Sequence, residues 1–139
     1  MFLGMTDVRT DAKGRVILPK SYRDELGERF YITAGFDRCA QVLSVDAFDR
    51  LREQIRALPA DKALALQYLV ISPAVAVSPN AQGRVMIPQK LREELSLEGE
   101  LTVVGMDTRI EIWNRDAFAR FMEQHKQQSV REMLELLRL

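Results

Sequence analysis

Arg15 and Arg84 are the residues whose type and spacing most suggest chemistry, because each follows a glycine in two copies of one pattern. The first copy reads Asp-Ala-Lys-Gly-Arg-Val-Ile-Leu-Pro over residues 11–19, and the second reads Asn-Ala-Gln-Gly-Arg-Val-Met-Ile-Pro over residues 80–88. An arginine beside a tight turn can offer its planar fork of donors to phosphates or to guanine edges. Alternatively, the glycines only permit the turns, and the arginines are solvated or bond carbonyl groups.

The charge around the two patterns favours an anionic partner. The whole chain has a formal net charge of zero, which by itself argues against nucleic acid. Residues 9–23, however, hold five basic side chains against Asp11 alone, and residues 80–92 hold three basic side chains and no acid. Positive charge is therefore concentrated on the repeated unit. This distribution is expected if one face meets a polyanion while the rest of the chain keeps the protein soluble.

Other kinds of site find little support. Cys39, the only cysteine, starts a predicted strand without a basic neighbour, so we expect a packed thiol rather than a nucleophile. His125, the only histidine, is expected to be solvated. With one Cys and one His we predict no metal site, no cofactor and no catalytic residues. Gly14 and Gly83 do not begin a phosphate-binding loop of the Walker type.

The length of 139 residues suits one compact domain or two closely packed half-domains. The sequence contains no apolar run approaching the roughly 20 residues of a membrane span, and no signal peptide is evident at its N-terminus. We therefore expect a cytoplasmic protein. The single cysteine is compatible with a reducing compartment.

The elements that must position Arg15 are two strands and a short helix. Residues 5–10 predict a strand, and Asp11 to Gly14 a tight reversal. Residues 16–18 are apolar on both faces, which predicts a central, covered strand. Pro19 then suits the first turn of a helix that carries Tyr22 and Leu26 on one face and ends at Gly27.

The rest of the first half predicts two strands over residues 30–33 and 40–45 and a helix that ends before Pro59, with Asp46 as its N-cap. Residues 61–71 predict a helical connection, and the same order of elements then repeats. Residues 129–139 can form an amphipathic helix capped by Ser129. An isolated helix of this length is marginal in water, so we expect it to dock on the protein itself or on a neighbouring subunit.

The pattern Asp11-x-x-Gly14-Arg15-Val16-x-x-Pro19 resembles the signature of the swapped-hairpin transcription factors related to AbrB and SpoVT. Two such signatures, with Met-Phe-Leu-Gly at residues 1–4 and Ile-Glu-Ile-Trp at residues 110–113, resemble the MraZ family over almost the whole chain. The resemblance implies an α+β fold, in which two tandem AbrB/SpoVT-like halves form a swapped-hairpin, mixed β-barrel-like core flanked by helices. The implied halves are residues 1–59 and 74–128. A helical connection over 60–73 joins them, and a C-terminal amphipathic helix over 129–139 follows.

MraZ proteins are regulators associated with the bacterial division and cell-wall gene cluster, and they assemble into rings. The family's Asp-x-x-x-Arg positions, which are implicated in DNA binding, fall on Asp11 and Arg15, whereas Asn80 replaces the aspartate before Arg84. Asparagine can still make the local turn bonds, but it cannot form a salt bridge to Arg84. The two turns are therefore expected to contact DNA unequally.

The function we predict is sequence-specific binding of double-stranded promoter DNA at repeated sites by a homo-oligomer, resembling a ring, that represses transcription at the nucleoid. We expect no membrane partner and no small-molecule substrate. Arg15 and Arg84 are the predicted direct contacts, and the turns also contain Asp11, Asn80, Gly14 and Gly83. The predicted phosphate-facing residues are Arg9, Lys13, Lys20, Arg23, Lys90 and Arg92. Two turns per chain neutralise few phosphates, so several subunits on repeated sites would gain roughly 10²–10⁴ in avidity.

A second class of function remains open, an antitoxin-like module that binds operator DNA and a toxin. Antitoxins with this half-fold usually carry one signature and a disordered tail, whereas this chain carries two signatures and an apparently helical C-terminus. An enzyme is the weakest of the three classes, since no nucleophile–base pair or metal constellation is evident.

Overall fold

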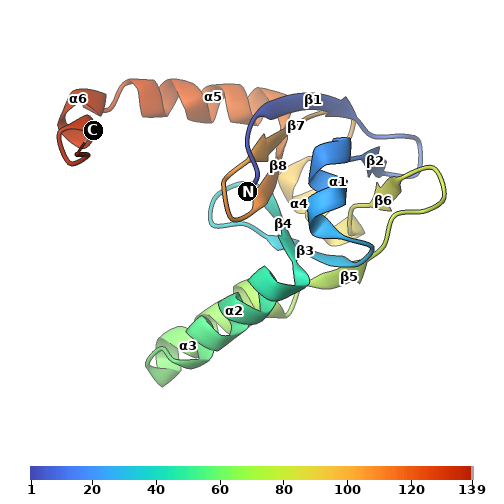
Figure 1. The fold of residues 1–139 in the computed structure, drawn as a ribbon, viewed down its shortest axis with the longest axis horizontal. Helices are drawn as coiled ribbons and strands as arrows, with labels where there is room; N and C mark the ends of the chain where they lie inside the picture. Colours follow the sequence, from blue (N-terminus) through green and yellow to red (C-terminus); the bar gives the residue numbers. More distant parts are fainter. Residues whose placement is uncertain (139) are drawn as a thin grey trace.

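The computed structural model describes residues 1–138, and its secondary structure shows the duplication directly (Figure 1). The first half contains β1 Met5–Arg9, β2 Arg15–Ile17, α1 Lys20–Leu26, β3 Phe30–Ala34, β4 Ala40–Ser44, α2 Val45–Arg56, α3 Ala60–Leu66 and the π-helical segment η1 Gln67–Ile71. The second half contains β5 Val75–Val77, β6 Arg84–Met86, α4 Gln89–Leu95, β7 Glu100–Gly105, β8 Ile110–Asn114, α5 Arg115–Lys126 and α6 Val130–Leu134.

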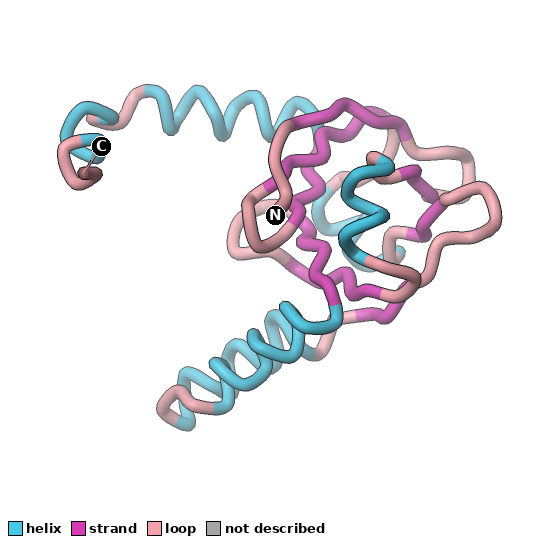
Figure 2. The backbone as a smooth tube through the Cα atoms, in the orientation of Figure 1, coloured by secondary structure: helices cyan, strands magenta, loops and turns pink. Residues whose placement is uncertain are grey.

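Each half completes its sheet with a strand from the other half. The larger sheet has six strands in the order β1-β7-β8-β4-β3-β5, which reads the same from either end when the halves are exchanged. Its first strand, β1, pairs with β7 of the second half, and β5 pairs with β3 of the first half. Figure 2 shows these strands curving around helices α1 and α4. The two halves therefore depend on each other for strand pairing and are not independent domains.

The α+β class is confirmed, but the expected mixed, barrel-like core is wrong. All described strand pairs are antiparallel, and the six-stranded sheet is open, with β1 and β5 at its edges. Strands β2 and β6 do not join it and form a separate two-stranded ribbon. Strands β2 and β6 have three residues each, and the proline two residues after each strand cannot donate to a ladder. These strands therefore offer too few ladder bonds to close a barrel.

The prediction that residues 16–18 form a central, covered strand is also wrong. β2 has only β6 as a neighbour, and its side chains alternate: Val16 is 1% exposed, whereas Ile17 is 45% exposed. The equivalent residues of β6 follow the same alternation, with Val85 buried and Met86 exposed. The ribbon thus has one face in the core and one face in solvent.

The core lies between the large sheet, the ribbon and the short helices α1 and α4. It contains Leu18 and Ile87, at matching positions of the repeat, together with Tyr22 and Leu26 of α1. Gly27 ends α1 as expected, with φ of 82° and its N–H donating to Arg23 O. The N-terminus joins the same core, since Phe2 packs edge-on against Tyr22.

Two helical arms extend from the other side of the sheet, away from the ribbon (Figure 1). One arm is the pair α2 and α3, and the other is α5 followed by α6. The N-cap of α2 is Ser44, whose hydroxyl accepts the Ala47 N–H, so the prediction of Asp46 is wrong; Asp46 lies in the first turn instead. Ser129 precedes α6 but makes no side-chain cap bond. Within the described residues, no helix is long and apolar enough to cross a membrane.

The alternation along the ribbon predicts very different costs for two isoleucines. We expect Ile87→Ala to lower the free energy of unfolding by about 2–5 kcal/mol, since Ile87 is fully buried and its removal leaves a cavity. Ile17→Ala, on the solvent face, should cost about 1 kcal/mol or less. Urea unfolding followed by circular dichroism measures both values. Equal costs would show that the ribbon's outer face is covered within the monomer.

Candidate nucleic-acid interface

The first turn is held together by one carboxylate. Asp11 Oδ1 accepts the backbone N–H groups of Lys13 and Arg15, both at 2.9 Å, while Oδ2 accepts Nε–H of Arg15 at 2.8 Å. Gly14, with φ of 77°, donates its N–H to Asp11 O and so closes the reversal. The side chain of Arg15 is held at its Nε, and it is 26% exposed. The bond at Nε leaves the two Nη groups of the guanidinium available for further hydrogen bonds.

This arrangement lowers the pKa of Asp11 from 3.8 to about 2. The backbone N–H of Arg15 lowers the pKa most; desolvation is the next largest effect and opposes it, while the Arg15 side chain and the Lys13 N–H add to the lowering. These donors stabilise the charged carboxylate. Asp11 is therefore ionised at any physiological pH, and the turn is fully formed there.

The second turn reproduces the backbone of the first without the charge. Asn80 Oδ1 accepts the N–H groups of Gln82 at 3.0 Å and Arg84 at 2.9 Å. Gly83, with φ of 79°, donates to Asn80 O. No carboxylate within residues 1–138 lies within salt-bridge distance of Arg84. The expectation that Asn80 still makes the local bonds of the turn is confirmed.

The register of the ribbon brings the two arginines onto one face. Arg15 of β2 lies opposite Met86 of β6, and Ile17 lies opposite Arg84. Residues directly opposite in an antiparallel pair share a face, so all four side chains lie on the solvent side. Each arginine therefore lies directly opposite one member of an exposed apolar pair, Met86 and Ile17, which are 43% and 45% exposed. Sequence reasoning missed this pair, although the alternation at positions 15, 17, 84 and 86 was a usable signal.

Four of the predicted phosphate-facing residues lie on the surface around this ribbon. Lys13 is exposed in the first turn. Arg9, Lys20 and Lys90 have side chains that are 74%, 78% and 76% exposed, and they pair with Glu100, Asp24 and Glu94 at 3.6, 3.0 and 4.0 Å. Such exposed ion pairs contribute little and exchange readily. These residues can turn toward a phosphate at low cost.

Arg23 and Arg92 are placed differently from the other basic residues. Arg23 Nε donates to Leu18 O at 3.0 Å, and Arg92 Nε donates to Ile87 O at 2.9 Å. The Arg92 side chain is only 16% exposed. Both arginines therefore have partners inside the protein.

The remaining polar groups do not form a second chemical centre. Cys39 is fully buried beside Trp113, and burial raises the pKa of its thiol to about 12. His125 lies on an exposed stretch of α5, edge-on to Phe121. No group of three or more potential metal ligands lies together in the part of the chain that the structure describes.

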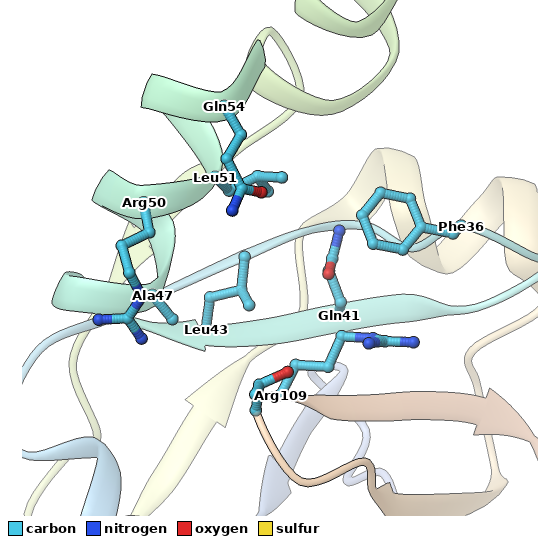
Figure 3. A pocket seen from close by; sticks show the side chains of 9 residues that line it. Phe36, Gln41, Leu43, Ala47, Arg50, Leu51, Gln54 and Arg109 are labelled. Carbon is cyan, nitrogen blue, oxygen red and sulfur yellow. The ribbon is translucent and has the colours of Figure 1, made fainter. Parts of the chain in front are cut away.

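A surface hollow lies between α2 and the sheet (Figure 3). Leu43 and Gln41 form its floor, and Arg50 and Leu51 of α2 form one wall. Gln41 is fully buried and donates its amide N–H to Ala34 O, but its Oε1 accepts no bond from the described residues. The hollow lies on the side of the sheet that carries the helical arms.

The fold and the two turns define a class: α+β proteins with two copies of a strand–turn–strand–helix unit, whose strands pair across the repeat and whose turns each present an arginine. Comparison with known families agrees with this description. The family model described as MraZ protein, antitoxin-like, matches the chain twice, over residues 1–68 and 70–137. The chain belongs to the MraZ family, which is regulatory and is not a known class of enzyme.

The two turns should respond differently to acid titration. Because the pKa of Asp11 is lower in the folded chain, its contribution to stability is complete well above pH 3.8 and is lost as the pH falls through about 2. NMR should show the amide resonances of Lys13 and Arg15 shifting with a midpoint near pH 2. Gln82 and Arg84, whose turn is held by Asn80, serve as the internal control and should not show this transition. A midpoint near 3.8 would mean that Asp11 does not hold the turn in solution.

Proposed function

We propose that the protein is a sequence-specific DNA-binding regulator of transcription, acting as a repressor at the nucleoid. The observation that carries this proposal is the shared solvent face of Arg15 and Arg84 on the β2–β6 ribbon. A two-stranded ribbon is one of the few elements that the major groove of double-stranded DNA admits. The proposal assigns this face to the groove.

The chemistry of the face matches base edges. Arginine bonds bidentately to O6 and N7 of guanine, and an apolar side chain contacts the methyl group of thymine. Arg15 and Arg84 stand at opposite ends of the ribbon, Arg15 opposite Met86 and Arg84 opposite Ile17. We infer an operator in which each contacted guanine has a thymine beside it. Asp11 would hold the Arg15 side chain ready, so little of its side-chain entropy would be lost on binding.

The basic rim supports the same assignment. Arg9, Lys13, Lys20 and Lys90 lie in or close to the turns and the helices behind them, and all four are exposed. They are proposed to contact phosphates, which fix the register of a protein on DNA without reading its sequence. The exchange of β1, β5 and the ribbon strands between halves supports our further proposal that each half has the swapped-hairpin topology of AbrB.

Homo-oligomerisation, with a ring as its form, is proposed from the helical arms. The first arm presents exposed apolar residues, Leu64, Tyr68 and Leu69, and the second presents Val130, Met133 and Leu134. Helix α5 contains no buried residue, whereas α2 packs against α3. Unlike patches on two separate arms favour head-to-tail contacts, which close into rings when the rotation between subunits permits. Several ribbons on repeated promoter sites would then bind with avidity.

An antitoxin-like role is the second candidate, and the description of the family favours it. In that role the apolar residues of α6 would bind a toxin rather than a neighbouring copy. Native mass spectrometry of the purified protein distinguishes the two: a homo-oligomer supports the first candidate, and a stoichiometric small partner supports the second.

Replacement of the ribbon arginines tests the DNA surface. DNA sites are first selected from a random duplex library with the unmodified protein. We expect Arg15→Ala and Arg84→Ala each to lose about 1–3 kcal/mol of binding free energy and to relax specificity at one position of the site. The larger loss is expected for Arg15, because Asp11 fixes its guanidinium before binding.

The matched control is Arg52→Ala, which removes the same charge from α2, where Arg52 pairs with Asp49. It should bind the selected sites as the unmodified protein does. If the Arg15→Ala, Arg84→Ala double variant remains a folded oligomer and binds like the Arg52 variant, the ribbon face is not the DNA surface.

A further inference from the structure

Arg23 and Arg92 each reach across to the turn of the opposite half. Gly14, in the first half, lies against the guanidinium of Arg92 from α4, and Gly83, in the second half, lies against that of Arg23 from α1. A Cβ at position 83 would stand 2.8 Å from Nη1 of Arg23, and a Cβ at position 14 would overlap the Arg92 guanidinium. The two contacts are related by the same pseudo-twofold exchange as the strands.

The Nε–H of each of these arginines donates to a backbone carbonyl of its own half. The acceptors, Leu18 O and Ile87 O, lie at matching positions just after β2 and β6. For Arg92, Nη1 also lies 3.7 Å from Glu98, and the backbone N–H of Ile87 donates to Gly14 O at 3.3 Å. The guanidinium of each arginine thus bonds groups of its own half and also packs against the backbone of the opposite turn.

We propose that Arg23 and Arg92 are positioning residues that hold the DNA-contacting turn of the opposite half, and that they are not phosphate contacts. The proposal rests on the proposed function for its consequence in DNA binding, but the positioning itself is a property of the free protein. It also gives the turn glycines a second role. Besides allowing a positive φ, the absence of a Cβ leaves room for the guanidinium plane.

Because each arginine contacts the turn of the opposite half, the two halves are linked at the turns 11–15 and 80–84, which we call the tips. Arg15 projects from the turn that Arg92 supports, and Arg84 projects from the turn that Arg23 supports. A change in α4 therefore alters the first tip, and a change in α1 alters the second. Lysine cannot substitute, because it lacks both the Nε–H donor at that position and the planar group that packs on glycine.

Amide hydrogen exchange in the free protein tests the positioning. Arg92→Ala should speed exchange at Lys13, Gly14 and Arg15 by about five- to tenfold, because loss of the guanidinium packing makes the turn easier to open, and leave residues 82–84 unchanged. Arg92→Lys, which keeps the charge and serves if the alanine variant does not fold, should act in the same way at the first turn. Arg23→Ala should show the reverse pattern. The matched control is Lys90→Ala, an exposed residue of the same helix, which should change neither turn.

Salt dependence of binding to the selected DNA then separates positioning from phosphate contact. A lost phosphate contact reduces the slope of log K against log salt by about 1. We expect Arg92→Ala to weaken binding at least several-fold with an unchanged slope, while Lys90→Ala reduces the slope by about 1. Unchanged exchange at residues 13–15, exchange that rises at the turn of the same half, or a slope reduced by about 1 for Arg92→Ala overturns the proposal. If no DNA site is selected, the proposed function fails, and the exchange pattern still decides the positioning.

Discussion

Pairing of strands across the sequence repeat is the constraint on which the rest of this structure depends. β1 and β5 find their partners in the opposite half, and β2 and β6 have only each other. Neither half can satisfy its backbone hydrogen bonds or bury Val16, Leu18, Val85 and Ile87 without the second. The duplication in sequence is therefore converted into one core with two equivalent tips, rather than into two domains.

The same constraint gives each turn of the surface ribbon contacts from both halves. An Asx side chain of the same half, Asp11 or Asn80, hydrogen-bonds the turn, and an arginine of the opposite half packs against its glycine. A loop with few contacts would lose conformational entropy on binding DNA, whereas a turn that is held on both sides has lost it on folding. The charge of Asp11 is the main difference between the two tips, and it makes the first the better fixed of the pair.

Helical arms and basic tips occupy opposite sides of the molecule, so the proposed assembly surface and the proposed DNA surface are separated in space. The ribbon face carries Arg15 and Arg84, while the exposed apolar residues gather on α3, η1 and α6. A subunit contact through the arms would leave the ribbon of every subunit accessible. This separation is what a regulator that reads repeated sites requires.

Turn residues and capping glycines are local signals, and the repeat recurs at a fixed offset. The sequence by itself therefore determined the duplication, the position of each Gly-Arg turn, the α+β class and the family. It also indicated that Cys39 is packed and that Asn80 keeps the turn but not the salt bridge. Only the tertiary structure decided which strands pair. The observed pairing contradicts the predicted covered position of residues 16–18 and the predicted barrel-like core. The interior positions of Arg23 and Arg92 were hidden for the same reason. Their carbonyl acceptors lie five residues away, but the turns that they contact lie in the other half of the chain, and a contact between residues about 60–80 positions apart leaves no periodic trace in a single sequence.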